Sequence, residues 1–318
     1  MKQATLVAAL ALCAASTATL AQSYPSRPIR FIVPFAAGSA PDHIARTFGE
    51  HMQKSLGQTI VIDNRPGAQG IVGASEALRS TPDGYTVFGG SNTTIAANPS
   101  LFKKLPYDPQ RDFTPVASFI HSALMLVVSP GFPAKNLREF IAHAKARPGQ
   151  LSAGYASAGM QVALAELRTL GGVTVLEVPY KGVPQAVTDI LAGQIHFTFA
   201  DYAVAFSQTK AGKVRGLAVT SPKRSPLAPD VPAMSEELPG FDVSVWNGLF
   251  VRSGTPREIV GRLNDAVQKA VTSPDVVAKL ALAGQEPMRM KPDEFRAFIA
   301  KEIAKWAAQI KRAGIQPE

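Results

Sequence analysis

Three loops in the sequence bring small residues together with neutral hydrogen-bonding groups, and each loop lies between a strand pattern and a helix pattern. They span residues 35–42, 90–94 and 156–159. The first N–H groups of a helix have no intrahelical partner, so such junctions can hold a carboxylate through main-chain donors and the helix dipole, without an arginine. Each loop alone is typical of a tight turn followed by a helix cap. Their joint occurrence at three strand-to-helix junctions favours a binding site for a small anion.

Patterns for catalysis or metal binding are weak by comparison. Ser157 lies in Tyr155-Ala156-Ser157-Ala158-Gly159, which resembles the GxSxG nucleophile turn, but Tyr155 replaces the glycine that relieves crowding there. The histidines form no HExxH pair, and no GxxxxGK[ST] phosphate-binding loop occurs. We therefore expect no metal, no cofactor and no enzymatic activity. A hydrolase that uses Ser157 stays open as an alternative.

The first 21 residues have the features of a secretory signal peptide. A charged start leads into an apolar run over residues 4–15, and small residues precede a plausible cleavage site after Ala21. We expect the mature protein to begin near Gln22 and to work outside the cytoplasm. The single cysteine, Cys13, is removed with this segment, which excludes disulfides and thiolate chemistry from the mature chain.

The charge distribution argues against nucleic-acid binding. The full chain of 318 residues carries a formal net charge of +9, and loss of Lys2 with the signal peptide leaves +8. Basic residues occur in pairs such as Lys103-Lys104, but there is no basic run and no interleaved aromatic ladder. This pattern is typical of a solvated surface that attracts small anions weakly.

Short β-branched stretches alternate with helical patterns, which is typical of βαβ units on parallel sheets. The mature chain exceeds one typical core, so two lobes of about 100 to 150 residues are expected. We predict strands over 29–33, 59–63, 85–88, 124–128, 151–156, 175–178, 195–199 and 214–219. Helices are predicted from about 40, over 71–79, 136–146 and 161–170, around 187–191, from 256, and over 292–313. The proline-rich segment 222–239 is interpreted as an extended crossing between the lobes.

A series of short motifs runs along essentially the whole mature chain. It comprises Tyr24-Pro25-Ser26-Arg27-Pro28-Ile29, Pro34-Phe35-Ala36-Ala37-Gly38, Asn64-Arg65-Pro66-Gly67-Ala68, Pro82-Asp83-Gly84-Tyr85-Thr86, Leu105-Pro106-Tyr107-Asp108-Pro109, Val178-Pro179-Tyr180-Lys181-Gly182, Leu217-Ala218-Val219-Thr220-Ser221, Asp230-Val231-Pro232 and Gly254-Thr255-Pro256. In this order and spacing the motifs resemble those of the periplasmic solute-binding receptors of tripartite tricarboxylate transporters, also called Bug proteins.

The resemblance implies an α/β protein with a two-lobed, type II periplasmic-binding-protein (flytrap) fold and a parallel-dominated sheet in each lobe. Residues 22–122 with 245–318 are expected to form one lobe, and residues 123–244 the other. Such a receptor traps a small organic acid in the periplasm, partly through ordered waters, and passes it to a large and a small integral-membrane transporter subunit. Di- and tricarboxylates, amino acids, nicotinic-type compounds and aromatic carboxylates are bound in such families. We expect a monomer.

Carried onto this sequence, the resemblance places ligand-binding residues in the loops of both lobes. They are Phe35, Ala37, Gly38, Ser39, Asp42, Ser91, Asn92, Ser157, Gly159, Gln161, Tyr180 and Asp201. Gly38, Ser39 and Ser157 are expected to supply donors, and Phe35 and Tyr180 to shape the cleft.

Three departures from the family's pattern accompany these expectations. Pro41 removes one donor from a loop that is usually richer in glycine, and the loop after Gly159 is shorter than usual. Ala200-Asp201 replaces a familiar Asp-Asn pair, which moves a carboxylate by one position. Asp201 or Asp42 is expected to order waters or side chains in the cleft.

A ligand-sensing subunit for a membrane sensor kinase is a further alternative. It would have the same lobes and the same cleft. Deletion of the gene separates the two functions, because it abolishes uptake in one case and only induction in the other.

Overall fold

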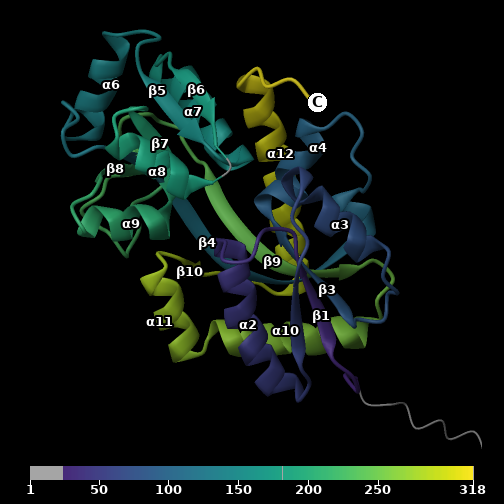
Figure 1. Cartoon of the computed structure of the whole chain (residues 1–318). Helices are drawn as coiled ribbons and strands as arrows, with labels where there is room; N and C mark the ends of the chain where they lie inside the picture. Colours follow the sequence, from purple (N-terminus) through teal and green to yellow (C-terminus); the bar gives the residue numbers. More distant parts are fainter. Residues whose placement is uncertain (1–23, 181, 318) are drawn as a thin grey trace, which may run out of the picture.

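The computed structural model describes residues 24–180 and 182–317. The predicted signal peptide and its cleavage site therefore lie outside the described residues. The chain forms two α/β lobes that share one 10-stranded sheet (Figure 1). Along this sheet the strand order is β2-β1-β3-β9-β4-β7-β5-β6, and β8 and β10 (Glu286–Pro287) pair with β4 off this path. Within the part of the chain that the structure describes, none of the helices has the length and apolar character needed to cross a membrane.

The N-terminal lobe is built on three parallel strands. Its strands are β1 (Ile29–Val33), β2 (Ile60–Asn64) and β3 (Thr86–Ser91). Its helical segments are α2 (Ala40–Leu56), η2 (Ala68–Gly70), α3 (Ile71–Leu78), η3 (Asn92–Ala97), α4 (Asn98–Leu101), α5 (Pro109–Asp112), α10 (Arg257–Val271) and α11 (Pro274–Leu282). On α2, Ile44, Phe48 and Met52 recur every four residues and are all buried, so the predicted apolar face is the one that packs.

The second lobe repeats the arrangement. Its strands are β5 (Ser152–Tyr155), β6 (Leu176–Pro179), β7 (Phe197–Asp201) and β8 (Arg215–Val219). Its helical segments are α6 (Leu137–Lys145), α7 (Ala158–Gly171), α8 (Val183–Leu191), α9 (Tyr202–Lys210) and η4 (Met234–Glu236). Strand β5 pairs in parallel with β6 and β7, whereas β7 and β8 run antiparallel to β4. Phe140, Phe197 and Phe199 fill the core of this lobe.

Two long strands, β4 (Phe113–Val128) and β9 (Ser244–Arg252), connect the lobes (Figure 1). Strand β4 pairs with β9 from Phe113 to Ala123, and then with β7 from Leu124 to Val128. The outer strands of each lobe are parallel as predicted. The central pairs are antiparallel because β9 returns alongside β4.

The expectation that residues 222–239 cross between the lobes is wrong. This segment packs onto the second lobe, where Ala228, Met234 and Leu238 are buried in the core and Val219 bridges to Ala233. The true second crossing, β9, went unpredicted. It is buried on both faces, so it lacks the alternation of a half-buried strand.

A glycine at the centre of β9 further obscured the strand pattern. A Cβ on Gly248 would lie 2.4 Å from the Phe295 ring and 2.8 Å from the Ala117 carbonyl oxygen. This close approach requires a glycine where a strand normally carries a side chain.

The last helix, α12 (Pro292–Arg312), lies against both lobes (Figure 1). Phe295 and Trp306 are buried, as the helical spacing predicts. The carboxylate of Glu302 accepts hydrogen bonds from Nε1 of Trp246 at 2.9 Å and from Nε1 of Trp306 at 3.2 Å. These bonds tie α12 to the crossing strand β9.

Candidate functional site

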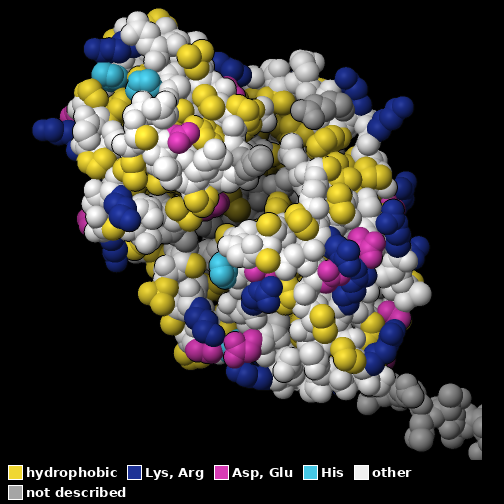
Figure 2. Space-filling model, in the orientation of Figure 1, with side chains coloured by type: hydrophobic (Ala, Val, Ile, Leu, Met, Phe, Trp, Pro, Cys, Tyr) yellow, Lys and Arg dark blue, Asp and Glu magenta, His cyan; other side chains and the backbone are white. Residues whose placement is uncertain are grey.

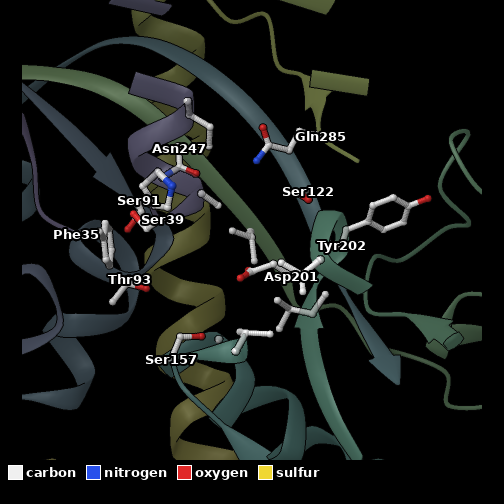
Figure 3. A pocket seen from close by; sticks show the side chains of 18 of the residues that line it. Phe35, Ser39, Ser91, Thr93, Ser122, Ser157, Asp201, Tyr202, Asn247 and Gln285 are labelled. Atoms are coloured by element: carbon white, nitrogen blue, oxygen red, sulfur yellow. The ribbon is translucent and has the colours of Figure 1, made fainter. Parts of the chain in front are cut away.

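A cavity of about 350 Å³ lies between the two lobes, a volume typical of small-molecule sites. Figure 2 shows the surface hollowed between the lobes, with basic side chains spread over the rest of the visible face. The cavity wall combines apolar side chains with hydroxyl and amide groups from both lobes (Figure 3). Among the described residues that line it, Asp201 carries the single charged side chain.

The loop between β1 and α2 forms part of the N-terminal wall. Phe35 and Ser39 both line the cavity. Ser39 is the N-cap of α2, and its Oγ accepts a hydrogen bond from the Asp42 N–H at 3.4 Å. Its hydroxyl hydrogen therefore stays available to a ligand. Pro41 stands in the first turn, where it leaves the cap intact but contributes no N–H.

Asp42 holds this loop in shape and does not line the cavity. Its side chain is 2% exposed and accepts hydrogen bonds from the Gly38 N–H at 2.9 Å, Asn64 Nδ2 at 3.0 Å and Arg46 Nε at 3.0 Å. Burial alone would raise the pKa of Asp42, but the hydrogen bonds from Arg46, Gly38 and Asn64 outweigh it and lower the pKa. Gly38 lines the cavity, but its N–H is already used by Asp42.

The start of η3 forms a second part of the N-terminal wall. Ser91 and Thr94 make a reciprocal capping box, and Ser91, Asn92 and Thr93 line the cavity. Asn92 also approaches the other lobe, since its Nδ2 lies 3.9 Å from the position that a Cβ on Gly159 would occupy. The two lobes therefore come close together at this edge of the cavity.

The second lobe contributes the start of α7. Ser157 is its N-cap and accepts a hydrogen bond from the Met160 N–H at 3.4 Å. Ser157, Gly159 and Met160 line the cavity. The first N–H groups of α7 have no acceptor within the helix, which leaves donors pointed at the space between the lobes. Among the described residues, no hydrogen bond joins Ser157 to a histidine or carboxylate that could activate it.

Several residues of the site were missed by sequence reasoning. They are Ser122 on β4, Asn247 on β9 and Gln285 after α11. All three line the cavity and add neutral hydrogen-bonding groups to it. The antiparallel crossing strands, which the sequence pattern did not reveal, place Ser122 and Asn247. Gln285 directly precedes β10, which pairs with β4.

Four of the predicted site residues lie away from the cavity lining. They are Ala37, Asp42, Gln161 and Tyr180. Tyr180 donates a hydrogen bond to Asp189 Oδ2 at 2.7 Å. Burial, together with this hydrogen bond, raises the pKa of the phenol to about 12. Gln161 lines a separate polar pocket beside the C-terminal end of α12.

No group of three or more histidine, cysteine or acidic side chains suited to a metal ion occurs among residues 24–180 and 182–317. His121 faces another pocket, next to Glu286 and the loop at 221–226, and burial lowers its pKa. The described lining of the cavity thus combines neutral hydrogen-bonding groups with the one carboxylate of Asp201.

Residues 44–315 match the model of the tripartite tricarboxylate transporter family receptor. The chain belongs to this receptor family. It is 36% identical to the protein BugT of Bordetella pertussis over 300 residues, which cover 92% of this chain and 91% of BugT. It is a solute-binding receptor and not an enzyme, and its two-lobed fold is that of the receptor family.

Two solved structures of similar proteins contain dicarboxylates. The chain is similar to Rpa4515 of Rhodopseudomonas palustris with adipate, with 32% identity, a TM-score of 0.86, and coverage of 93% of this chain and 100% of the other. It is also similar to MatC of the same organism with bound malate, with 34% identity, a TM-score of 0.80, and coverage of 90% and 100%.

Proposed function

We propose that this receptor captures a small carboxylate-bearing solute in the periplasm and delivers it to a tripartite tricarboxylate-type transporter with a large and a small membrane subunit. One observation carries the proposal: three serine N-caps, Ser39, Ser91 and Ser157, converge from two lobes on one cavity. Helix starts and hydroxyl donors suit a carboxylate. The adipate and malate in the similar proteins support the same ligand class.

The proposal also covers export of the protein and the division of the chain into two lobes. A leader over residues 1–21 directs secretion, and residues 22–122 with 245–318 and residues 123–244 act as the two lobes of a monomer. The change of partner of β4 between Ala123 and Leu124 supports the first boundary. The start of β9 at Ser244 supports the second.

A thermal-shift screen of the mature protein against organic acids tests capture. A ligand present at a hundred times its dissociation constant stabilises the folded state by about 2.7 kcal/mol, which is easily detected. The Ser39→Ala and Ser157→Ala variants should each weaken binding about tenfold, because each removes a donor to a charged group. Ser207, an exposed serine on α9 outside the cavity, gives the matched control Ser207→Ala.

Ser39 and Ser157 also cap helices, so each alanine variant should lose about 1 kcal/mol of stability. Affinity is therefore measured by calorimetry at a temperature where each variant is fully folded. The proposal fails if no organic acid binds, or if Ser207→Ala weakens binding as much as the cavity variants do. Uptake of the bound acid in a deletion strain, complemented by the wild-type gene, tests delivery.

A further inference from the structure

Asp201 stands at the end of β7, immediately before α9, and its backbone pairs with Leu124 on β4. This is the N-cap position of α9, where an aspartate normally accepts a hydrogen bond from the helix. The side chain of Asp201 makes no such bond. Figure 3 shows it directed into the cavity, while the neighbouring Tyr202 points away.

The Asp201 carboxylate has no hydrogen-bond or ion-pair partner among the described residues. The described lining of the cavity also contains no lysine, arginine or histidine. Burial raises the pKa of Asp201, and no charged neighbour among the described residues offsets this rise. A carboxylate in such a place is costly unless something pairs with it.

The groups across the cavity have the opposite character. Ser39 and Ser91 lie opposite Asp201 in Figure 3, and the N-terminal ends of α2 and α7 open onto the same space. These groups offer hydroxyl and N–H donors that suit an anion. The cavity thus presents neutral donors from both lobes, and those of Ser39 and Ser91 face the bare carboxylate of Asp201.

We propose that Asp201 binds a protonated amine or another cationic N–H group of the ligand, while the donors opposite hold the ligand's carboxylate. The ligand class is then an amine-bearing carboxylate. A simple dicarboxylate would place its second carboxylate against Asp201, and like charges brought together in a cleft disfavour binding. This inference rests on the proposed function, because it assumes that the cavity binds a carboxylate.

Calorimetry near neutral pH with matched ligands tests this assignment. The pairs are γ-aminobutyrate and succinate, δ-aminovalerate and glutarate, and ε-aminocaproate and adipate. The common α-amino acids are compared with the same acids lacking the amine. We expect the tightest ligand to carry an amine and to bind at least tenfold better than its amine-free counterpart.

Asp201→Asn should remove most of this preference and improve binding of the dicarboxylates. The variant should fold normally, since the carboxylate makes no hydrogen bond or ion pair with any other described residue. Asp265→Asn, at an exposed position on α10, is the matched control and should leave the preference unchanged.

Two results would overturn the assignment: a tightest ligand without a cationic N–H group, or an amine preference that persists in Asp201→Asn. In either case a carboxylate still binds, and the receptor function stands. Failure of every carboxylate to bind would instead refute the proposed function.

Discussion

Arg312 on α12 forms a bidentate ion pair with Glu166 on α7, with its Nη2 atom 2.8 Å from Oε1 and 2.9 Å from Oε2. Glu166 is completely buried, whereas the Arg312 side chain is 45% exposed. Helix α7 belongs to the second lobe and begins at the cavity, whereas α12 packs mainly on the N-terminal lobe. The ion pair therefore fastens the last helix to the second lobe.

Arg312→Ala should therefore destabilise the protein by about 2 to 3 kcal/mol. This loss of unfolding free energy is smaller than for a fully buried ion pair, because water reaches the Arg312 side chain. Urea unfolding measures it. Replacing both partners, as in Glu166→Gln with Arg312→Gln, should cost less than Arg312→Ala alone, since no charge is left buried. Equal costs would show that leaving the Glu166 carboxylate buried without its partner carries no extra penalty.

Gly284 lies against Tyr202 in a backbone conformation that only glycine adopts easily. Its φ is +62°, and a Cβ there would lie 1.7 Å from Cδ1 of the Tyr202 ring. Gly284→Ala should destabilise the protein by roughly 3 kcal/mol or more in urea unfolding. Gly240→Ala is the matched control, with φ +88° and open space, and should cost about 1 kcal/mol. Similar losses in both variants would contradict the predicted clash.

Trp306 reports on the cavity because its Cη2 lies 3.8 Å from the position of a Cβ on Gly159, a cavity residue. The chain contains two tryptophans. Binding of an organic acid from the screen should change the tryptophan emission, since it alters the surroundings of the α7 start. Trp306→Phe should abolish the change, and Trp246→Phe should retain it. The reverse pattern would place the response at Trp246.

Asp42 gives a prediction about pH. Its pKa is lower in the folded protein than in the unfolded chain, where it is about 3.9. Its stabilising effect is therefore fully present above that unfolded value and is lost as the pH falls through the folded one. Asp42→Asn should cost about 1 to 3 kcal/mol at neutral pH.

The difference between Asp42→Asn and wild type should shrink below about pH 4, because the unfolded chain binds a proton at Asp42 there and the folded protein binds one only at lower pH. Urea unfolding across acidic pH checks this. A constant difference at every pH would mean that the charge of Asp42 contributes nothing to the loop.

The serine caps of the site could be predicted from the sequence because they are local. Ser39, Ser91 and Ser157 each follow a recognisable strand and precede a recognisable helix, and all three line the cavity. Their chemistry depends on a few neighbouring residues, which a pattern captures.

Residues brought in by long-range pairing could not be predicted in this way. Asn247 reaches the cavity because β9 pairs with β3 and β4, and nothing local marks it. Tyr180 and Asp42 lie off the cavity lining for a related reason. Sequence placed both near the cleft, but Asp189 binds the first, and Gly38, Arg46 and Asn64 surround the second.

The continuity of β4 and β9 through both lobes has a mechanical consequence. Any rotation of one lobe against the other must be absorbed as small changes of twist along two paired strands, and not at a single loose joint. Such a ribbon resists bending in proportion to the angle. The elastic energy of that bending reduces the net free energy of ligand binding. The stiffness of the two strands therefore helps to set the affinity for the ligand.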